Sequence, residues 1–212
     1  MTDWAAVLRA GMAARLMEET DAAHDLGHLD RVCHSALAIA AAEGGDPEVL
    51  TAAAYLHDLV NLPKDHPERA TASRHSAEAA RARLAGLGFP AEKLDAVAHA
   101  IEAHSFSAGI APRTAEARIL QDADRLEALG AIGIARVFYT AARMGAALFD
   151  PEDPGAATRP LDDRRFALDH FRVKLFAIAD TLHTPTARAM AARRVALMRD
   201  FTAAMLAEAE GR

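Results

Sequence analysis

The sequence predicts an all-α fold for this chain of 212 residues. Hydrophobic residues make up 51% of it, enough for a substantial core, but aromatic residues account for only 5%. Alanine is used heavily, and it has the highest helix propensity, whereas strands favour β-branched and aromatic side chains. Glycine and proline separate long segments that carry helix start and stop signals. We therefore expect closely packed helices rather than a sheet.

Start and stop signals divide the first half of the chain into five expected helices. The clearest start is Asp46-Pro47, because aspartate caps a helix and proline fits its first turn. Gly44-Gly45 and Gly88 mark helix ends, and two prolines between residues 61 and 67 predict a loop there. The second expected helix starts between residues 21 and 25 and ends at about 43. The other four cover residues of about 3–19, 46–60, 71–87 and 90–104.

The second half is expected to hold three more helices. The first starts near Thr114 and extends as far as Met144, with Gly130 and Gly133 explained by close packing or a kink. Three prolines predict a long excursion over 149–160, followed by helices of about 161–180 and 185–210. Because no linker composition interrupts the chain, we expect one domain over 1–212. Its core would cover about 21–145, and the helices of about 161–210 would pack on it as an appendage.

Charge and composition exclude several function classes. The net charge is −6 and the chain has no basic run, which argues against a nucleic-acid polymer or a membrane surface as partner. No apolar stretch approaches the ~20 residues of a membrane span. The single cysteine, Cys33, excludes an intramolecular disulfide and is compatible with a reducing cytoplasm. We expect it to be a small core residue. Nothing here indicates the oligomeric state.

The most informative motif is the pair His57-Asp58, which closes the apolar run 52–56. A buried histidine beside a buried aspartate is costly unless a charge compensates it, and a divalent metal does so directly. His28 upstream and Asp124 downstream would complete a set of four donors. Imidazole and carboxylate ligands suit Mn, Fe, Co, Ni or Zn, and Mg is also compatible.

A second pair, His24-Asp25, competes with this assignment. It lies at a polar helix start, whereas His57-Asp58 follows an apolar run that would bury it. His24 and His28 are four positions apart and share a helix face, so His24 is either a contact to the substrate or ion or an ordinary helix-start residue. Asp122, two positions before Asp124, is expected to be a surface acid.

The order of these donors resembles the H…HD…D signature of the HD-domain metal-dependent phosphohydrolases. Further stretches between about residues 24 and 180 are similar to a bacterial branch of small HD-domain hydrolases. The resemblance implies an all-helical HD fold that hydrolyses phosphate esters or anhydrides. Some members of the branch cleave nucleoside triphosphates to the monophosphate and pyrophosphate, which implies a nucleotide substrate. The similar stretches are 61–64, 100–107, 121–130 and 159–163.

In this interpretation a metal-bound water attacks phosphorus, and nearby side chains assist. Lys64 and Arg74 follow the metal pair and are candidate phosphate contacts. Arg125 follows a ligand and is expected to orient it or to bind the substrate. His104 is a candidate for proton transfer, for a hydrogen bond to phosphate, or for a second metal.

Two alternatives remain open at this point. Some HD proteins hold two metals by adding two histidines between the HD pair and the last aspartate, and His75 and His104 have suitable spacing. Such a site would allow di-iron oxygenase chemistry. The other alternative is a non-catalytic HD-fold binding module, for which a broken set of ligands is expected, whereas all four are present here.

Overall fold

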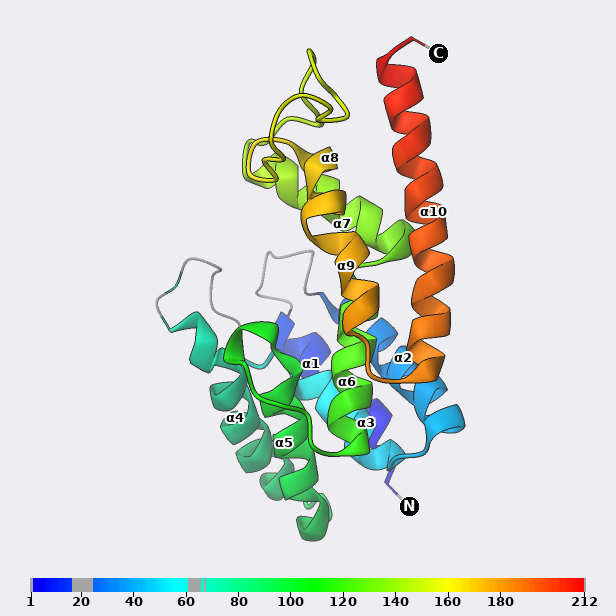
Figure 1. The fold of residues 1–212 in the computed structure, drawn as a ribbon. Coiled ribbons are helices and arrows are strands. Elements are labelled where there is room, and N and C mark those ends of the chain that lie inside the picture. Colours follow the sequence, from blue (N-terminus) through cyan, green and yellow to red (C-terminus); the bar gives the residue numbers. More distant parts are fainter. Residues whose placement is uncertain (1, 17–24, 61–65, 67, 212) are drawn as a thin grey trace. The chain divides into compact units, whose positions relative to one another are not determined.

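The computed structural model describes residues 2–16, 25–60, 66 and 68–211 (Figure 1). Within these ranges the regular elements are helices, which confirms the all-α prediction, and the only β pairing is an isolated bridge between Ala147 and Phe166. The chain divides into two compact units, Met1–Asp124 and Arg125–Arg212. The predicted packing of residues 161–210 on the N-terminal core stays a prediction.

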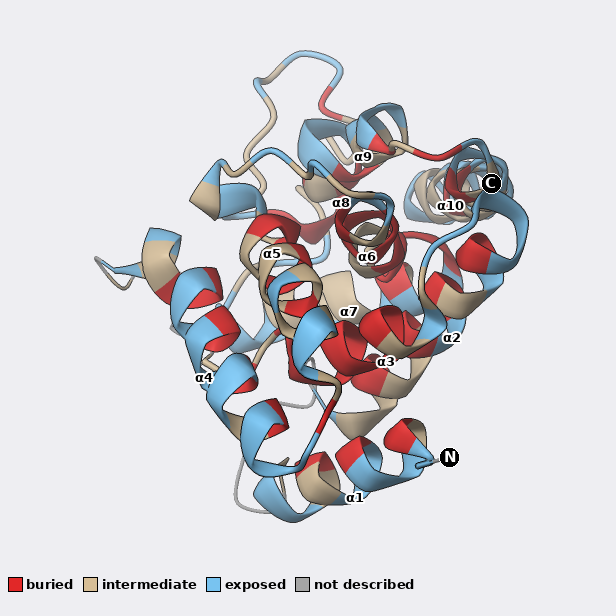
Figure 2. Ribbon diagram, turned by 90° about the horizontal axis from the view of Figure 1, so that it is seen from below, coloured by how far each residue is buried: buried red, intermediate tan, exposed pale blue. Residues whose placement is uncertain are grey.

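The N-terminal unit is organised around α3, whose residues from 49 to 56 are all buried (Figure 2). This helix packs against α1, α2, α4 and α5. Its run of small alanines lets neighbouring backbones approach closely, as the composition predicted. The helices are α1 (Trp4–Leu16), α2 (Leu26–Glu43), α3 (Pro47–Leu56), α4 (Ala72–Gly86), α5 (Leu94–His104) and α6 (Ala115–Leu126), with short 3-10 turns at Arg69–Thr71, Ala91–Lys93 and Phe106–Ala108.

Local caps set the start of α3 and the end of α2. Asp46 accepts hydrogen bonds from the first backbone N–H groups of α3, and Gly44 ends α2 with a φ of 83°, as the sequence predicted. Helix α3 stops at Leu56, two residues too early to include the whole motif. His57 is therefore the C-cap, and Asp58 lies in the following turn rather than in the last helical turn.

The C-terminal unit has an aromatic core. The ring of Phe138 lies 6.2 Å from that of Phe171 and 5.9 Å from that of Phe201, which joins α7 to α10. Arg159 organises the preceding excursion, because its guanidinium donates two hydrogen bonds to the buried Asp169. The elements are α7 (Gly130–Arg143), α8 (Ala167–His170), a π-helical turn (Phe171–Leu175), α9 (Phe176–Ile178), a 3-10 turn (Ala179–Thr181) and α10 (Pro185–Ala209).

The expected continuous helix from Thr114 to Met144 is wrong. It breaks after Leu126 and resumes at Gly130, whose φ of 77° excludes a continuous helix through this position. A Cβ at Gly133 would lie 2.3 Å from the backbone oxygen of Ala128, so the glycine permits a very close approach. The two glycines therefore mark a break between two helices rather than a kink within one.

The helix expected from residue 161 begins only at Ala167. Residues 163–165 form a turn and Phe166 is extended, and Ala147 donates to the carbonyl of Arg165 and accepts from the N–H of Ala167, both at 2.9 Å. These hydrogen bonds compete with helical ones for the same groups.

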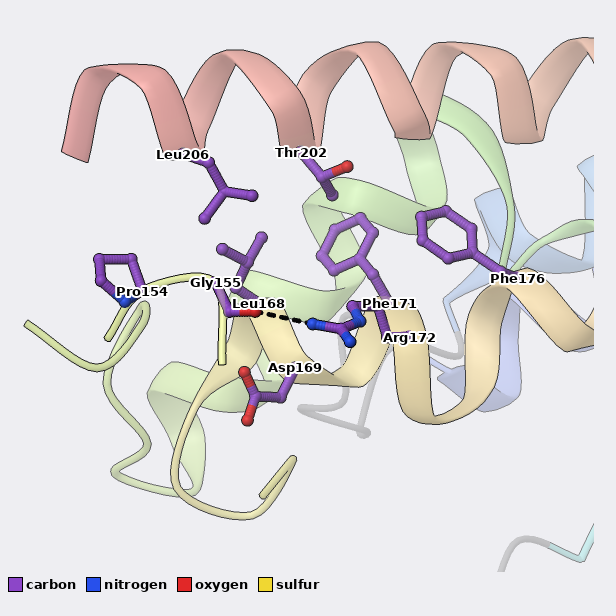
Figure 3. A pocket seen from close by; sticks show the side chains of 9 residues that line it. All are labelled: Pro154, Gly155, Leu168, Asp169, Phe171, Arg172, Phe176, Thr202 and Leu206. Atoms are coloured by element: carbon purple, nitrogen blue, oxygen red, sulfur yellow. Dashed lines mark hydrogen bonds between the residues drawn. The ribbon is translucent and has the colours of Figure 1, made fainter. Parts of the chain in front are cut away.

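The C-terminal unit also contains a small, mainly apolar cleft between α10 and the segment 154–176 (Figure 3). Its two charged side chains are already engaged, since Arg172 donates to the carbonyl of Gly155 at 2.7 Å and Asp169 is bonded to Arg159. None of the sequence-predicted site residues lines it. In the described part of the chain no helix is both long and apolar enough to cross a membrane.

Candidate metal centre

The predicted donors converge in the N-terminal unit. His28 lies on α2, His57 and Asp58 lie at the end of α3, and Asp124 lies on α6. Donor atoms of His28, His57 and Asp58 all lie within 4.8 Å of one another. An oxygen of Asp124 is 3.7 Å from Nε2 of His28 and 4.0 Å from Nε2 of His57. Residues almost a hundred positions apart therefore form one cluster.

The spacing of the donors fits a single transition-metal ion. The Nε2 atoms of His28 and His57 are 3.4 Å apart, and a carboxylate oxygen of Asp58 lies 3.4 Å from Nε2 of His57. Two ligands bound at about 2.1 Å from one ion lie roughly 3.0–3.4 Å apart when the angle between them is octahedral or tetrahedral.

Backbone carbonyls orient two of the imidazoles. Nδ1 of His57 lies 2.8 Å from the carbonyl oxygen of Ala54, and Nδ1 of His104 lies 2.6 Å from that of Ile101. The last carbonyls of a helix lack helical partners, so a histidine at the helix end can donate to them. A proton on Nδ1 leaves the Nε2 lone pair available as a metal ligand or base. Sequence reasoning missed these contacts, although a histidine at an expected helix end was a usable signal.

The electrostatics of the cluster favour a bound cation. His57 is fully buried, and burial alone lowers its pKa, but the carboxylates of Asp58 and Asp124 outweigh this and raise the pKa to about 9. Burial works against both carboxylates, yet His57 and the neighbouring histidines hold the pKa of Asp58 well below its usual range and lower that of Asp124. The two carboxylates thus favour a positive charge between them, and a bound divalent ion would supply that charge.

His104 adjoins this cluster. Its Nε2 lies 3.6 Å from an oxygen of Asp58, and its ring packs edge-on against the ring of His57. Because the side chain is buried and its Nδ1 is held by the backbone, Nε2 has a fixed direction. This position suits either a further ligand or a proton-transfer group next to the ion.

The second predicted histidine lies elsewhere. His75 is half exposed on α4, with its Nδ1 3.8 Å from a carboxylate oxygen of Glu78. The structure therefore brings His104, but not His75, to the side of Asp58. Arg74, also on α4, has an exposed guanidinium 3.4 Å from Glu102.

The remaining candidates fall into three cases. His24 and Lys64 lie outside the described residues. Arg125 donates a hydrogen bond of 2.7 Å to the carbonyl of Thr181 within the C-terminal unit. Asp122, expected at the surface, is fully buried, because it occupies the inward face of α6, and this prediction was wrong.

Asp25 has a structural role of its own. Its carboxylate accepts a hydrogen bond of 2.8 Å from the backbone N–H of His28 and so caps α2. The rival pair His24-Asp25 thus contributes its aspartate to the helix that carries His28.

Two supporting contacts hold the turn that follows the pair. The hydroxyl of the buried Ser76 accepts from the N–H of Val60 at 2.9 Å and lies 3.3 Å from its carbonyl oxygen. Arg15 donates to the carbonyl of Leu59 at 2.8 Å. Sequence reasoning found neither residue, since an isolated serine or arginine carries no signal of a partner at long range.

Comparison with known proteins agrees with this geometry. The family model described as "HD domain" matches residues 25–129, a range that contains all four donors. YpgQ of Bacillus subtilis (strain 168) is 31% identical over 190 residues, which cover 88% of this chain and 84% of YpgQ. The chain belongs to the HD-domain phosphohydrolase superfamily. The resemblance drawn from the order of the donors is thereby confirmed.

Solved structures of this HD family extend the similarity over both units. The crystal structure of B. subtilis YpgQ in complex with ADP has a TM-score of 0.74 at 31% identity, with 96% of each chain covered. An HD-superfamily hydrolase from Bacillus thuringiensis has a TM-score of 0.76 at 28% identity, with 98% of this chain and 97% of that one covered. HD domains bind divalent metals, and the cluster around His57 provides suitable donors.

Proposed function

We propose that this HD protein hydrolyses a nucleoside triphosphate to the monophosphate and pyrophosphate, with a divalent ion held by His28, His57, Asp58 and Asp124. The observation that carries the proposal is the convergence of these side chains, with the Nε2 of His57 fixed by the backbone. The ADP complex of YpgQ, a relative similar over nearly the whole chain, supports a nucleotide as the ligand.

The chemistry is divided between the ion and the side chains. A divalent ion bound here supplies Lewis acidity, which lowers the pKa of water and polarises a phosphoryl oxygen. Asp58, whose carboxylate lies 3.4 Å from Nε2 of His57 and 3.6 Å from Nε2 of His104, keeps its charge and anchors the donor set. His104, with its Nε2 directed at Asp58, accepts a proton from water or joins the ligands.

Basic side chains would bind the phosphates, since the net charge of −6 gives no general attraction for an anion. Arg74 is exposed and can exchange its ion pair with Glu102 for a bidentate contact to phosphate. Lys64, His24 and Arg125 remain proposed contacts from their places in the sequence.

Hydrolysis is favoured over the two alternatives. A di-iron oxygenase of the binuclear type would need His75 as well as His104, and His75 lies in an exposed contact with Glu78. A non-catalytic binding module has no need for all four donors, nor for the backbone contact that orients His57.

The test combines metal content with product analysis. Purified protein is assayed by mass spectrometry for metals, and pyrophosphate and phosphate release is measured from a nucleotide panel with Mn, Co, Ni or Mg. We expect about one ion per chain and pyrophosphate release from a triphosphate. His57→Ala should lose both, whereas the control His75→Ala, which changes an exposed histidine, should keep both. Two irons per chain without hydrolysis would indicate oxygen chemistry, and no metal with no turnover would indicate a binding module.

A further inference from the structure

Phe106 is the most exposed large apolar side chain in the described part of the chain. Its exposed fraction is 83%, and the next highest is 62%, for Met144. Other phenylalanines, such as Phe89 and Phe171, are buried in the cores of their units. Single exposed apolar residues are common on proteins, so exposure alone indicates nothing. The position of Phe106 relative to the metal centre is what gives it meaning.

Phe106 follows His104 by two residues. Consecutive residues span at most about 3.6 Å each, so its Cα lies within about 7 Å of that of His104. The Nε2 of His104 is in turn 3.6 Å from Asp58. The aromatic side chain is therefore attached at the edge of the metal centre, within the same compact unit.

A short hydrogen-bonded turn carries Phe106. It begins the 3-10 turn Phe106–Ala108, whose end is fixed by Gly109 with a φ of 64° and a hydrogen bond to the carbonyl of Phe106. The hydroxyls of Ser105 and Ser107 are bonded to each other at 3.0 Å. This turn packs against the 3-10 turn that leads into α4, the helix of Arg74. An exposed ring thus stands on a fixed turn between His104 and a candidate phosphate contact.

We propose that Phe106 is the nucleobase contact of this site and stacks on the base of a bound nucleotide. The inference rests on the proposed function. In a nucleotide the base lies one ribose away from the phosphates, so phosphates at the ion place the base at the rim. A flat aromatic face binds any base by stacking, because every base has a π-face, and it needs no hydrogen-bonding partner. Phe106 therefore selects nucleotides over inorganic phosphates without selecting among bases.

The test compares a ligand that has a base with one that lacks it. Binding of ADP and of inorganic pyrophosphate to the Mn-loaded protein is measured by calorimetry for the wild type and for Phe106→Ala. Stacking on one aromatic ring contributes about tenfold or more in affinity. We expect Phe106→Ala to weaken ADP binding by about that factor and to leave the affinity for pyrophosphate within about twofold of the wild type. Phe106→Trp keeps an aromatic face and should bind ADP with about the wild-type affinity.

Two controls make the result specific. Leu87→Ala removes another exposed apolar side chain of the same unit and should alter neither affinity. Leu87 lies at the end of α4 opposite to the 3-10 turn Arg69–Thr71, against which the turn of Phe106 packs. Phe106→Leu keeps an apolar side chain without a π-face and should resemble Phe106→Ala. The inference is overturned if ADP affinity is unchanged in Phe106→Ala or if both ligands weaken equally. Failure of the proposed function has a different signature, namely no pyrophosphate release by the wild type despite ADP binding.

Discussion

At the scale of single residues, the centre depends on groups that bind no metal themselves. The carbonyls of Ala54 and Ile101 fix the direction of His57 and His104, and each lies three positions before its histidine. Loss of a group that orients a metal ligand typically lowers metal affinity or activity by about 10–100-fold. The turn after Asp58 is held in the same way, by side chains from other helices.

Ser76 gives the first prediction at this scale. Ser76→Ala removes the hydroxyl that bonds both backbone groups of Val60 and leaves a partly buried N–H without this acceptor. We expect the free energy of unfolding, measured by urea denaturation, to fall by about 1–2 kcal/mol. Metal affinity should fall with it, because the turn carrying Asp58 loosens. The exposed Ser107 provides a control, and Ser107→Ala should change stability by less than about 0.5 kcal/mol. If Ser76→Ala and Ser107→Ala had the same free energy of unfolding, Ser76 would not stabilise the turn at Val60.

At the scale of elements, the histidines of the centre all lie at helix ends. His57 caps the end of α3, and His104 is the last residue of α5, whereas His28 lies in the first turn of α2. A network of polar side chains joins α1, α2 and α3. Asp30 on α2 accepts a hydrogen bond of 2.9 Å from the hydroxyl of Tyr55 on α3 and is paired with Arg9 on α1.

This network predicts a dependence of stability on pH. Burial raises the pKa of Asp30, but the hydrogen bonds from Arg9 and Tyr55 outweigh burial and lower the pKa below its ordinary value of 3.8. A carboxyl whose pKa is lower in the folded state stabilises the fold above 3.8, and the contribution is lost as the pH falls through the folded value. Asp30→Asn should therefore cost about 1 kcal/mol at neutral pH, with a smaller difference from the wild type at about pH 3. Denaturation series at both pH values would show this convergence. A constant difference would indicate a packing effect instead of a charge effect.

At the scale of the whole molecule, the clustered donors belong to one of two compact units. His28, His57, Asp58 and Asp124 all lie in the N-terminal unit, and so does Trp4, the only tryptophan. Trp4 is buried against Phe89, so its fluorescence reports the unfolding of this unit. The similarity to YpgQ nevertheless covers 96% of the chain, so the relative shares both units.

Metal binding should stabilise the unit that contains the donors. A ligand that binds only the folded state at about 100 times its Kd adds about 2.7 kcal/mol. For a chain of this size that corresponds to a rise of roughly 5–10 °C in the midpoint followed by Trp4 fluorescence. A chelator should reverse the shift, and His57→Ala should show none. A shift that persists in His57→Ala would place the ion elsewhere.

The sequence by itself determined the helical class, most helix starts and the order of the donors. These are local or compositional properties: Asp46-Pro47 starts a helix wherever it occurs, and an alanine-rich chain with few aromatic residues favours helices. The pair His57-Asp58 was recognisable because an apolar run precedes it. The family match and the all-helical structure confirm these parts.

Only the tertiary structure decided which side chains meet. Whether His75 or His104 lies beside Asp58 depends on how α4 and α5 pack, and the spacing of the two histidines along the chain does not specify this. The break before Gly130 likewise depends on packing, because the backbone of Ala128 lies very close to Gly133. Asp122 is buried because it lies on the face of α6 that points into the core. Contacts between residues far apart in the chain depend on packing, and a single sequence records local preferences far more clearly than long-range ones.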